Sequence, residues 1–494
     1  MNVKNYLDDY KKCMIIFLVF IVMFVFAMFT PENFADCKHE VIFIGILTIF
    51  GLIGIYYSHK HELEFHKIAL LLIIIFGLAM VFFTPPFSFP DEPAHYTRAE
   101  LISEGYLYPE ITSNGIQVND YYFSFQDSFN GVTVLSENHN YNTPITEHKG
   151  YWEWTTSSPF YTYLLSALGI LIAKLMNLSA IWALYLSRIA NLVFYAAVAY
   201  FMIKIIPKYK LPLFVFATIP LCISQVSFSS YDAFILTFTL IIITYFVKMR
   251  LGEVSRKNLA IFFTSVLLIS LIKQPYIILA FLVLAIPFED KKLKKYSIIA
   301  TIAIILLSVL SVESLFSSLF TTAAVQTHNT STVSNISFVG QARFILKNPL
   351  VIFTLLKDMI VSIPNLFLLK ANFFHYTGYK GIKLVNLLYL VFFIGFSLFY
   401  KIDIELRKKE KYLLGLICII CYIGINIIFY LTWSPVGSDS ILGVQLRYFL
   451  PVAPLIPLIF SSKYKKIENK EIYIFTFIII CLTGLAMLPI THFY

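Results

Sequence analysis

The sequence predicts an all-α, polytopic integral membrane protein with about thirteen transmembrane helices. Hydrophobic residues make up 58% of the 494 positions and charged residues only 14%, which is more apolar than a soluble core requires. Apolar runs able to cross a hydrocarbon layer of about 30 Å recur from one end of the chain to the other. Such runs are expected to be helical, because lipid offers no hydrogen-bond partner to an open backbone.

Ten apolar runs are clear candidates for spans: 14–30, 41–57, 68–84, 182–203, 211–229, 232–249, 297–314, 383–400, 412–432 and 472–489. Three shorter runs, 258–272, 275–288 and 449–461, bring the expected number to thirteen. The first run has no small-residue cleavage site and another run follows it, so we interpret it as an anchor rather than a signal peptide. The six cysteines fall mostly within spans, which indicates neither a disulfide framework nor a cysteine metal site.

The positions of Lys and Arg predict the topology, because cytoplasmic loops of membrane proteins carry an excess of both. Two further apolar stretches, 158–176 and 349–368, decide how the spans are counted. If neither crosses, 25 of the 38 Lys and Arg residues lie on the inner side, in 1–13, 58–67, 204–210, 248–257, 289–296, 401–411 and 462–470. We therefore predict an inner N-terminus and an outer C-terminus, with both stretches lying along the outer surface. The net charge of +9 follows from this bias and indicates no nucleic-acid partner.

This topology divides the chain into three membrane regions and two long external loops. The regions are the N-terminal helices (1–84), a large external loop with interfacial helices (85–181), a central bundle (182–314), a second external loop with an interfacial helix (315–382) and the C-terminal helices (383–494). The first loop is acidic and contains the aromatic clusters "NDYYFSF" and "GYWEWTT". These clusters either stack on sugar rings or form the core of a small outer domain, and we favour the core.

The stretch "FPDEPAHYTRAELISEG" begins that loop and predicts a short helix from Asp91 that stops at Gly105. Asp91 is expected to cap the helix, and the spacing places Asp91, His95 and Arg98 on one side, with Glu92 on the neighbouring stripe. The cluster is either a polar site at the lipid–water boundary or an interfacial helix with a capping Asp, a boundary Glu and a snorkelling Arg.

Three other segments bring polar side chains to the predicted outer ends of spans. These side chains are Asp232, Lys273, Gln274, Tyr276, Gln445, Arg447 and Tyr448. Each alone has a helix-capping or snorkelling explanation. Together with the first loop they supply cations for a phosphate and a carboxylate for proton removal, which is what a phosphorylated, lipid-attached substrate requires.

Five motifs, in this order, resemble a family of bacterial multi-pass membrane proteins formerly described only as a domain of unknown function. The motifs are "FPDEPAHYTRA", "SSPFYTYL", "SSYDAF", "LIKQPYI" and "GVQLRYFLPVAPL". The resemblance covers about Phe87 to the end, and Leu446 stands where the pattern has Gly. That family is similar to the GT-C superfamily of membrane glycosyltransferases, which use polyprenyl-phosphate sugars. A location in the bacterial cytoplasmic membrane is implied.

The resemblance implies roles for two acids. In the superfamily an Asp of the first external loop acts as a base or a metal-associated carboxylate, which corresponds to Asp91, with Glu92 beside it. A second acid in the next external turn corresponds to Asp232. Because these carboxylates offer hard oxygen ligands, Mg²⁺ or Mn²⁺ is a candidate cofactor, although no metal ligand is assigned.

The sequence thus leads to one functional hypothesis and two alternatives. We expect transfer of a sugar from an undecaprenyl-phosphate donor to an extracytoplasmic acceptor, such as a cell-wall glycopolymer or a lipid-linked glycan. Asp91 and Glu92 are the expected catalytic residues. The expected substrate-binding residues are His95, Arg98, Asp232, Lys273, Gln274, Tyr276, Gln445, Arg447 and Tyr448. The alternatives are a transporter or flippase of a lipid-linked glycan, and a structural partner in a wall-assembly complex.

Overall fold

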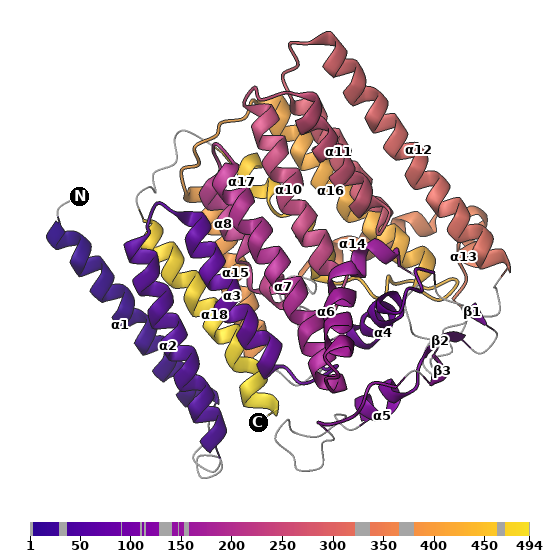
Figure 1. Ribbon diagram of the computed structural model, residues 1–494. Coiled ribbons are helices and arrows are strands. Elements are labelled where there is room, and N and C mark those ends of the chain that lie inside the picture. The colour runs from indigo at the N-terminus through magenta and orange to yellow at the C-terminus, as the bar shows by residue number, and fades with distance from the viewer. Residues whose placement is uncertain are drawn as a thin grey trace.

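The computed structural model describes residues 3–28, 37–89, 91–108, 111–112, 115–127, 141–146, 148–152, 158–321, 336–364, 380–461 and 470–493. Within these ranges almost every element is a helix, and the long helices run side by side (Figure 1). By length and composition, seven described helices are able to cross a membrane: Asp9–Ala27, Lys38–Lys60, Phe65–Phe83, Ala180–Ile205, Asp232–Arg250, Lys408–Thr432 and Glu471–Ile490. The predicted all-α, polytopic class is confirmed, whereas the count of thirteen spans stays a prediction.

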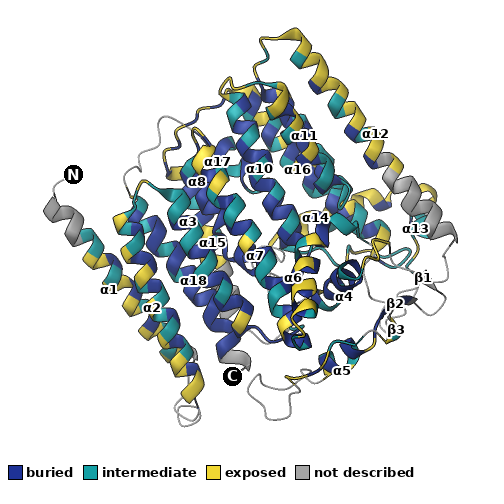
Figure 2. Ribbon diagram, viewed as in Figure 1, coloured by how far each residue is buried: buried dark blue, intermediate teal, exposed yellow. Residues whose placement is uncertain are grey.

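The bundle has a flanking part and a central part. The flanking helices are α1 (Val3–Met28), α2 (Lys38–Lys60), α3 (Phe65–Phe83) and α18 (Glu471–Phe493). The central helices are α7 (Ala180–Ile205), α10 (Asp232–Arg250), α11 (Arg256–Ser270), η2 (Gln274–Ala285), α12 (Lys291–Thr321), α15 (Lys380–Phe399) and α16 (Lys408–Thr432). Figure 2 shows that burial is concentrated in α7, α10 and α18, while α2 and α12 carry exposed faces. Those exposed residues are mainly Ile, Leu, Val and Tyr, as expected for helices that contact lipid.

Two of the predicted spans are wrong as continuous helices. The run 211–229 forms α8 (Lys210–Ala217) and α9 (Pro220–Val226), and the run 449–461 forms η4 (Leu446–Val452) and α17 (Leu455–Ile459). Proline explains both breaks, because it lacks a backbone N–H and disfavours helical geometry in the residue before it. Pro220 begins α9, and Pro454 precedes α17.

Buried side chains satisfy the carbonyl groups that these breaks expose. The Tyr195 hydroxyl donates to Ala217 O (3.0 Å), and the Tyr209 hydroxyl donates to Pro454 O (2.6 Å). Tyr276 in η2 donates in the same way to the carbonyl of Tyr448, at 3.0 Å. Because a buried carbonyl without a partner is costly, these hydroxyls offset the cost of the helix breaks within the buried core.

A small outer region packs on one end of the bundle. It contains α4 (Glu92–Ser103), α5 (Tyr121–Asp127), η1 (Phe160–Tyr163), α6 (Leu164–Leu175) and an antiparallel sheet of β1 (Ile111–Thr112), β2 (Gly115–Asn119) and β3 (Lys149–Trp152) in the order β1-β2-β3. The sheet was not predicted, because its strands are two to five residues long. Tyr121, Tyr122 and Phe125 of "NDYYFSF" are buried with Tyr96, so this cluster forms a core as expected.

The stretches 158–176 and 349–368 were predicted to lie along the outer surface. The first contains the apolar helix Phe160–Leu175, made of η1 and α6, and the second contains α14 (Val351–Pro364), with residues 365–368 outside the described residues. The placement of both stretches along the outer surface stays a prediction. The helix preceding α14, α13 (Phe338–Lys347), packs against α16.

The two ends of the bundle differ in charge. Arg250 at the end of α10 pairs with Glu410 at the start of α16, with 2.9 Å between Nη2 and Oε2. The basic segments 204–210, 248–257 and 401–411 border α7, α8, α10, α11 and α16 at this end. The outer region and the C-terminus lie at the opposite end, away from the N-terminus (Figure 1).

Single cysteines at Ser440 and Glu253 test the topology. Both side chains are exposed; Ser440 follows α16 and Glu253 follows α10, at opposite ends of the bundle. In intact cells, a membrane-impermeant thiol reagent should label position 440 and should reach position 253 only after permeabilisation. Of the six native cysteines, five are buried and Cys418 is intermediate, so background labelling should be low. Labelling of position 253 from outside would contradict the predicted orientation.

Candidate active site

The first turn of α4 places two adjacent acids in opposite surroundings. Asp91 stands at the N-cap in the left-handed region (φ 65°), and its side chain makes no capping hydrogen bond. The predicted helix is therefore present, but the predicted capping role of the Asp91 side chain is wrong. Its carboxylate accepts instead from Nη2 of Arg447, more than 350 residues further along the chain.

Glu92 turns inward and forms a fully buried ion pair with Arg188 of α7. Arg188 donates from Nε to Oε1 (2.8 Å) and from Nη2 to Oε2 (2.6 Å), which is the bidentate geometry of a strong pair. The backbone N–H of Ser229 also donates to Oε1, at 3.2 Å. Glu92 therefore contacts α7 and the segment that leads into α10.

The remaining N–H groups of Arg188 hold the end of α3. Nη1 donates to the carbonyls of Val81 and Thr84, both at 2.9 Å, and Nη2 donates to Pro85 O at 3.1 Å. All five guanidinium donors are used, so the desolvated charge is well compensated. Sequence reasoning missed Arg188, although a charged residue within an apolar run is itself a signal that a partner exists.

Arg447 joins the two acids that sequence reasoning proposed for the site. It lies in η4, is almost completely buried, and contacts Asp91 through Nη2 and Asp232 through Nη1, the latter with 3.3 Å to Oδ2. Nη2 also donates to the Tyr448 hydroxyl at 3.3 Å. Two carboxylates from separate segments therefore converge on a single guanidinium, as the clustering of polar side chains at one membrane face predicted.

Lys273 adds a second buried cation next to Arg447. Its Nζ lies 3.1 Å from the centroid of the Tyr448 ring, with the rings of Tyr231 and Phe429 at 5.5 and 5.8 Å. Among the described residues the ammonium has no hydrogen-bond partner. Burial in this aromatic surrounding lowers the pKa of Lys273 to about 7, although Asp232 opposes the shift. An anion placed here would favour the charged form.

His95 is a buried residue of α4 that packs against Tyr163 and Tyr231. Its Nδ1 is hydrogen-bonded to the Tyr163 hydroxyl at 2.7 Å, and its ring meets the ring of Tyr231 edge to face at 4.7 Å. Burial lowers the pKa of His95 to about 4, although Asp91 and Asp232 oppose the shift. His95 is therefore neutral near pH 7 and adds no charge to the site.

The other predicted binding residues have different surroundings. Arg98 is buried and donates to the carbonyls of Ser158, Tyr106 and Leu107, which makes it an anchor for the outer loop rather than part of the Arg447 cluster. Tyr276 and Tyr448 are joined by the hydroxyl–carbonyl bond described above. Gln274 is the first residue of η2 and directly follows Lys273. Gln445 is the N-cap residue of η4, which contains Arg447.

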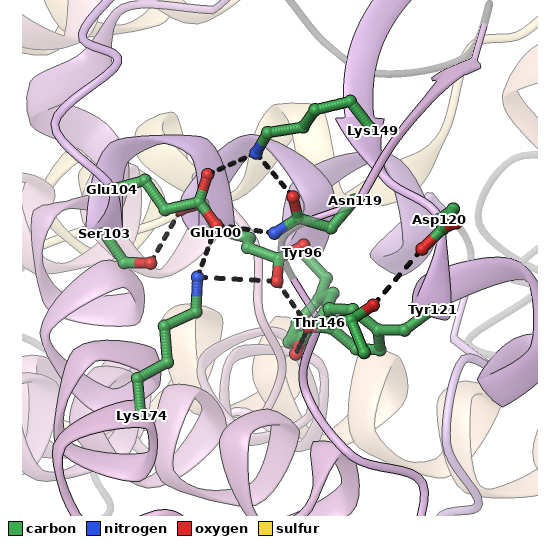
Figure 3. A network of polar contacts seen from close by, with 10 residues as sticks. All are labelled: Tyr96, Glu100, Ser103, Glu104, Asn119, Asp120, Tyr121, Thr146, Lys149 and Lys174. Atoms are coloured by element: carbon green, nitrogen blue, oxygen red, sulfur yellow. Dashed lines mark hydrogen bonds and ion pairs between the residues drawn. The ribbon is translucent and has the colours of Figure 1, made fainter.

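A second polar network fixes α4 from its other end (Figure 3). Glu104 accepts from Lys149 of β3 (2.6 Å) and Lys174 of α6 (2.7 Å), and Glu100 accepts from the Tyr121 hydroxyl (2.5 Å). Burial raises the pKa of Glu100, whereas the two lysines and Asn119 outweigh burial at Glu104 and hold its pKa below the usual range. Sequence reasoning missed this network, which ties the sheet and α6 to α4.

The candidate metal ligands do not form a metal site as placed. The carboxylate of Glu92 is engaged by Arg188, and the guanidinium of Arg447 lies between Asp91 and Asp232. In the described ranges, no three His, Cys, Asp or Glu residues gather in a way that could hold an ion.

A family described as "Predicted membrane protein (DUF2142)" matches residues 74–456, which is more than half of the chain. The protein belongs to this family. The expected membership of a multi-pass membrane family is thereby confirmed, and the likeness to the GT-C superfamily stays a prediction. Asp91, Asp232, Lys273 and Arg447 all lie within the DUF2142 range, whereas α1, α2 and the C-terminal helix α18 lie outside it. No curated protein and no solved structure matches the chain.

The Arg188–Glu92 pair predicts a strong effect of removing one partner. Arg188→Met should destabilise the fold by about 3–5 kcal/mol, because it leaves the Glu92 charge and three carbonyls buried without their donor. The measurement is the apparent melting temperature of the detergent-purified protein. Adding Glu92→Gln to the same chain should recover part of the loss. Arg343→Met on the exposed face of α13 is the matched control, and a stable Arg188→Met protein would contradict this role.

Buried His95 predicts that stability falls on acidification. Its folded pKa is about 4 against an ordinary value of 6.5, so between these values the unfolded chain binds a proton that the folded protein does not. The contribution is therefore complete above pH 6.5 and is lost towards pH 4, by up to about 3 kcal/mol.

Melting temperatures measured from pH 7 to pH 5 test this assignment. His95→Gln should flatten the decline, whereas His148→Gln, which changes an exposed histidine of the same loop, should follow the wild type. An unchanged pH dependence in His95→Gln would show that another group causes the decline.

Proposed function

We propose that this protein is an inverting glycosyltransferase of the GT-C type, which transfers a sugar from a polyprenyl-phosphate donor to an extracytoplasmic glycan acceptor. The observation that carries the proposal is the meeting of two carboxylates and two cations at one end of the bundle. Asp91, Asp232, Lys273 and Arg447 come from four separate segments, and the side chain of Asp91 is 52% exposed. An exposed carboxylate beside buried cations suits the reaction of an alcohol with a phosphate ester.

The proposed reaction is a single displacement at the anomeric carbon. The Asp91 carboxylate takes the proton of the acceptor hydroxyl as the oxygen of that hydroxyl attacks C1 of the sugar. The bond between C1 and the phosphate oxygen breaks, and its electron pair leaves with the polyprenyl phosphate. Lys273 and Arg447 offset the charge that grows on the departing phosphate. The products are an inverted glycoside, a protonated Asp91 and a polyprenyl monophosphate.

The place of the cluster in the bundle supports a lipid-attached donor. The cluster joins the start of α4, the start of α10 and η4, at the end of the bundle that lies away from the basic segments. A polyprenyl phosphate keeps its phosphate at the membrane surface and its tail in the lipid. With the predicted orientation, the reacting atoms would lie on the outer side of the bacterial cytoplasmic membrane, where glycan acceptors are found.

The proposal separates the roles of the two adjacent acids. Glu92 was expected to be catalytic, but both of its carboxylate oxygens are engaged by Arg188 and it is fully buried. We therefore assign Glu92 to positioning the first turn of α4 and keep Asp91 as the base. Arg98 likewise acts through the outer loop, because its Nε, Nη1 and Nη2 each donate to a backbone carbonyl there.

A lipid-linked glycan transporter or flippase is the second candidate function, and the broken spans favour it. Discontinuous helices near the bilayer midplane are typical of transporter binding sites, and α8–α9 and η4–α17 are discontinuous here. Against it, the ionisable cluster gathers at one end of the bundle rather than along a path through it. No internal repeat is visible in the sequence.

Asp91→Asn tests the base directly. Asn keeps the size of the side chain but cannot accept the proton, so the rate of glycan transfer should fall by about 10²–10⁴-fold. Arg447→Ala should weaken use of the donor by leaving the phosphate without its cation. Glu92→Gln should act mainly by lowering the amount of folded protein. The measurement is transfer from a lipid-linked sugar by equal amounts of folded protein.

Asp120→Asn is the matched control for these variants. It removes one carboxylate from the same outer loop, at an exposed position where the Asp120 side chain accepts a hydrogen bond from Thr146. Transfer by this control should equal the wild-type rate. An Asp91→Asn protein with wild-type turnover would refute the assignment of Asp91 as the base.

A further inference from the structure

We propose that Asp91 keeps the anion site on Arg447 closed until a lipid phosphate displaces it, so that donor binding itself releases the catalytic base. This inference rests on the proposed function and concerns the order of events at the same site. It starts from a difference between two buried arginines. Arg188 has a partner for every N–H group, whereas Arg447 leaves Nε and Nη1 without a hydrogen-bond partner among the described residues.

The planar geometry of a guanidinium decides how an oxyanion can bind to Arg447. Two parallel hydrogen bonds can form on the edge that carries Nε and Nη2, or on the edge that carries Nη1 and Nη2. Both edges include Nη2, and Nη2 is held by Asp91 and by the Tyr448 hydroxyl. A phosphate can therefore bind in the bidentate way only by taking Nη2 from one of them.

The carboxylates select which edge a phosphate would use. Asp232 faces Nη1 at 3.3 Å, so an anion on the Nη1–Nη2 edge would meet a negative charge at close range. The Nε–Nη2 edge avoids that contact. Nη2 is held by the neutral Tyr448 hydroxyl and by Asp91, and Asp91 is the charged competitor of a phosphate there. Its side chain is half exposed, so water can replace the guanidinium as its partner.

A second cation makes the exchange favourable. Lys273 Nζ and the Arg447 guanidinium carbon approach the same Tyr448 ring, with 3.1 and 5.2 Å to its centroid. The Lys273 ammonium is buried and has no hydrogen-bond partner in the described part of the chain. A phosphate placed between the two cations would satisfy both, whereas the pairing of Asp91 with Arg447 leaves the Lys273 ammonium without a hydrogen bond in the described part of the chain.

Replacement of Asp91 by the donor phosphate on Arg447 couples donor binding to proton transfer. While Asp91 is paired with Arg447, its carboxylate is held by the guanidinium rather than by an acceptor hydroxyl. Once the phosphate takes Arg447, the half-exposed carboxylate is released to accept the proton of that hydroxyl. After it has taken the acceptor proton it is neutral and competes poorly for Arg447. The product phosphate is then displaced only after Asp91 loses that proton.

The contacts of Glu92 hold the first turn of α4, so the Asp91 side chain can move without disturbing the helix. The backbone of the first turn is held by the Arg188–Glu92 pair and by the Ser229 N–H bond to Glu92. Asp91 itself is outside the helix, at the N-cap, and makes no capping bond. Rotation of its side chain away from Arg447 therefore breaks no capping bond of the helix.

Binding of undecaprenyl phosphate to the detergent-purified, full-length protein tests the inference without any sugar transfer. If Asp91 competes with the phosphate, Asp91→Asn should bind the lipid about three- to tenfold more tightly than the wild type. Asp120→Asn makes the same change in net charge away from Arg447 and should bind like the wild type. Undecaprenol, which lacks the phosphate, should bind the wild type and Asp91→Asn equally.

The outcomes separate this inference from the function on which it rests. If the wild type binds undecaprenyl phosphate but Asp91→Asn binds it equally or more weakly, Asp91 is no competitor and the exchange is refuted while the transferase proposal stands. If the wild type binds undecaprenyl phosphate no better than undecaprenol, the proposed donor class fails and the exchange fails with it. Equal tightening by Asp120→Asn would assign the effect to overall charge and would also refute the exchange.

Discussion

The buried ion pair between Glu92 and Arg188 is the interaction on which the candidate site depends. It joins the end of α3, the start of α4, the middle of α7 and the segment before α10, and the bonds from Asn191 to Phe228 O and from Ser187 to Ser229 add to the link between α7 and that segment. Charge buried at this depth is tolerable because every donor of Arg188 has a partner. The pair thus fixes the point at which the chain leaves the membrane and turns into the outer region.

Two neighbouring acids acquire different chemistry from this arrangement. The helix turns the Glu92 side chain into the protein, where it is saturated with hydrogen bonds, and the left-handed backbone of Asp91 turns the other carboxylate towards Arg447. Glu92, whose carboxylate oxygens are both held by Arg188, has a structural role. Asp91 is half exposed and is paired with a cation that has unused N–H donors, so it can exchange partners. The same contrast separates Arg188 from Arg447, and it indicates the function of each more clearly than charge or burial does.

Part of this arrangement was predictable from the sequence. Apolar runs predicted the helices, and polar residues at their ends predicted that Asp91, Asp232, Lys273 and Arg447 would meet, because the ends of neighbouring spans share a membrane face. Hydropathy is insensitive to helix breaks, so it treated the proline-interrupted runs as continuous. The direction of a side chain depends on tertiary packing, so the spacing of Asp91 and Glu92 could not separate the base from its neighbour. Arg188 did carry a signal, since its charge lies within an apolar run.

The most direct measurement of the central claim is the release of undecaprenyl phosphate from a lipid-linked sugar by the purified protein. The protein is reconstituted into liposomes with the donor, and a glycan acceptor is then added outside. A transferase should release undecaprenyl phosphate only when the acceptor is present, in an amount equal to the sugar transferred. Movement of intact lipid-linked sugar across the bilayer, without any release, would contradict the account and would identify a transporter.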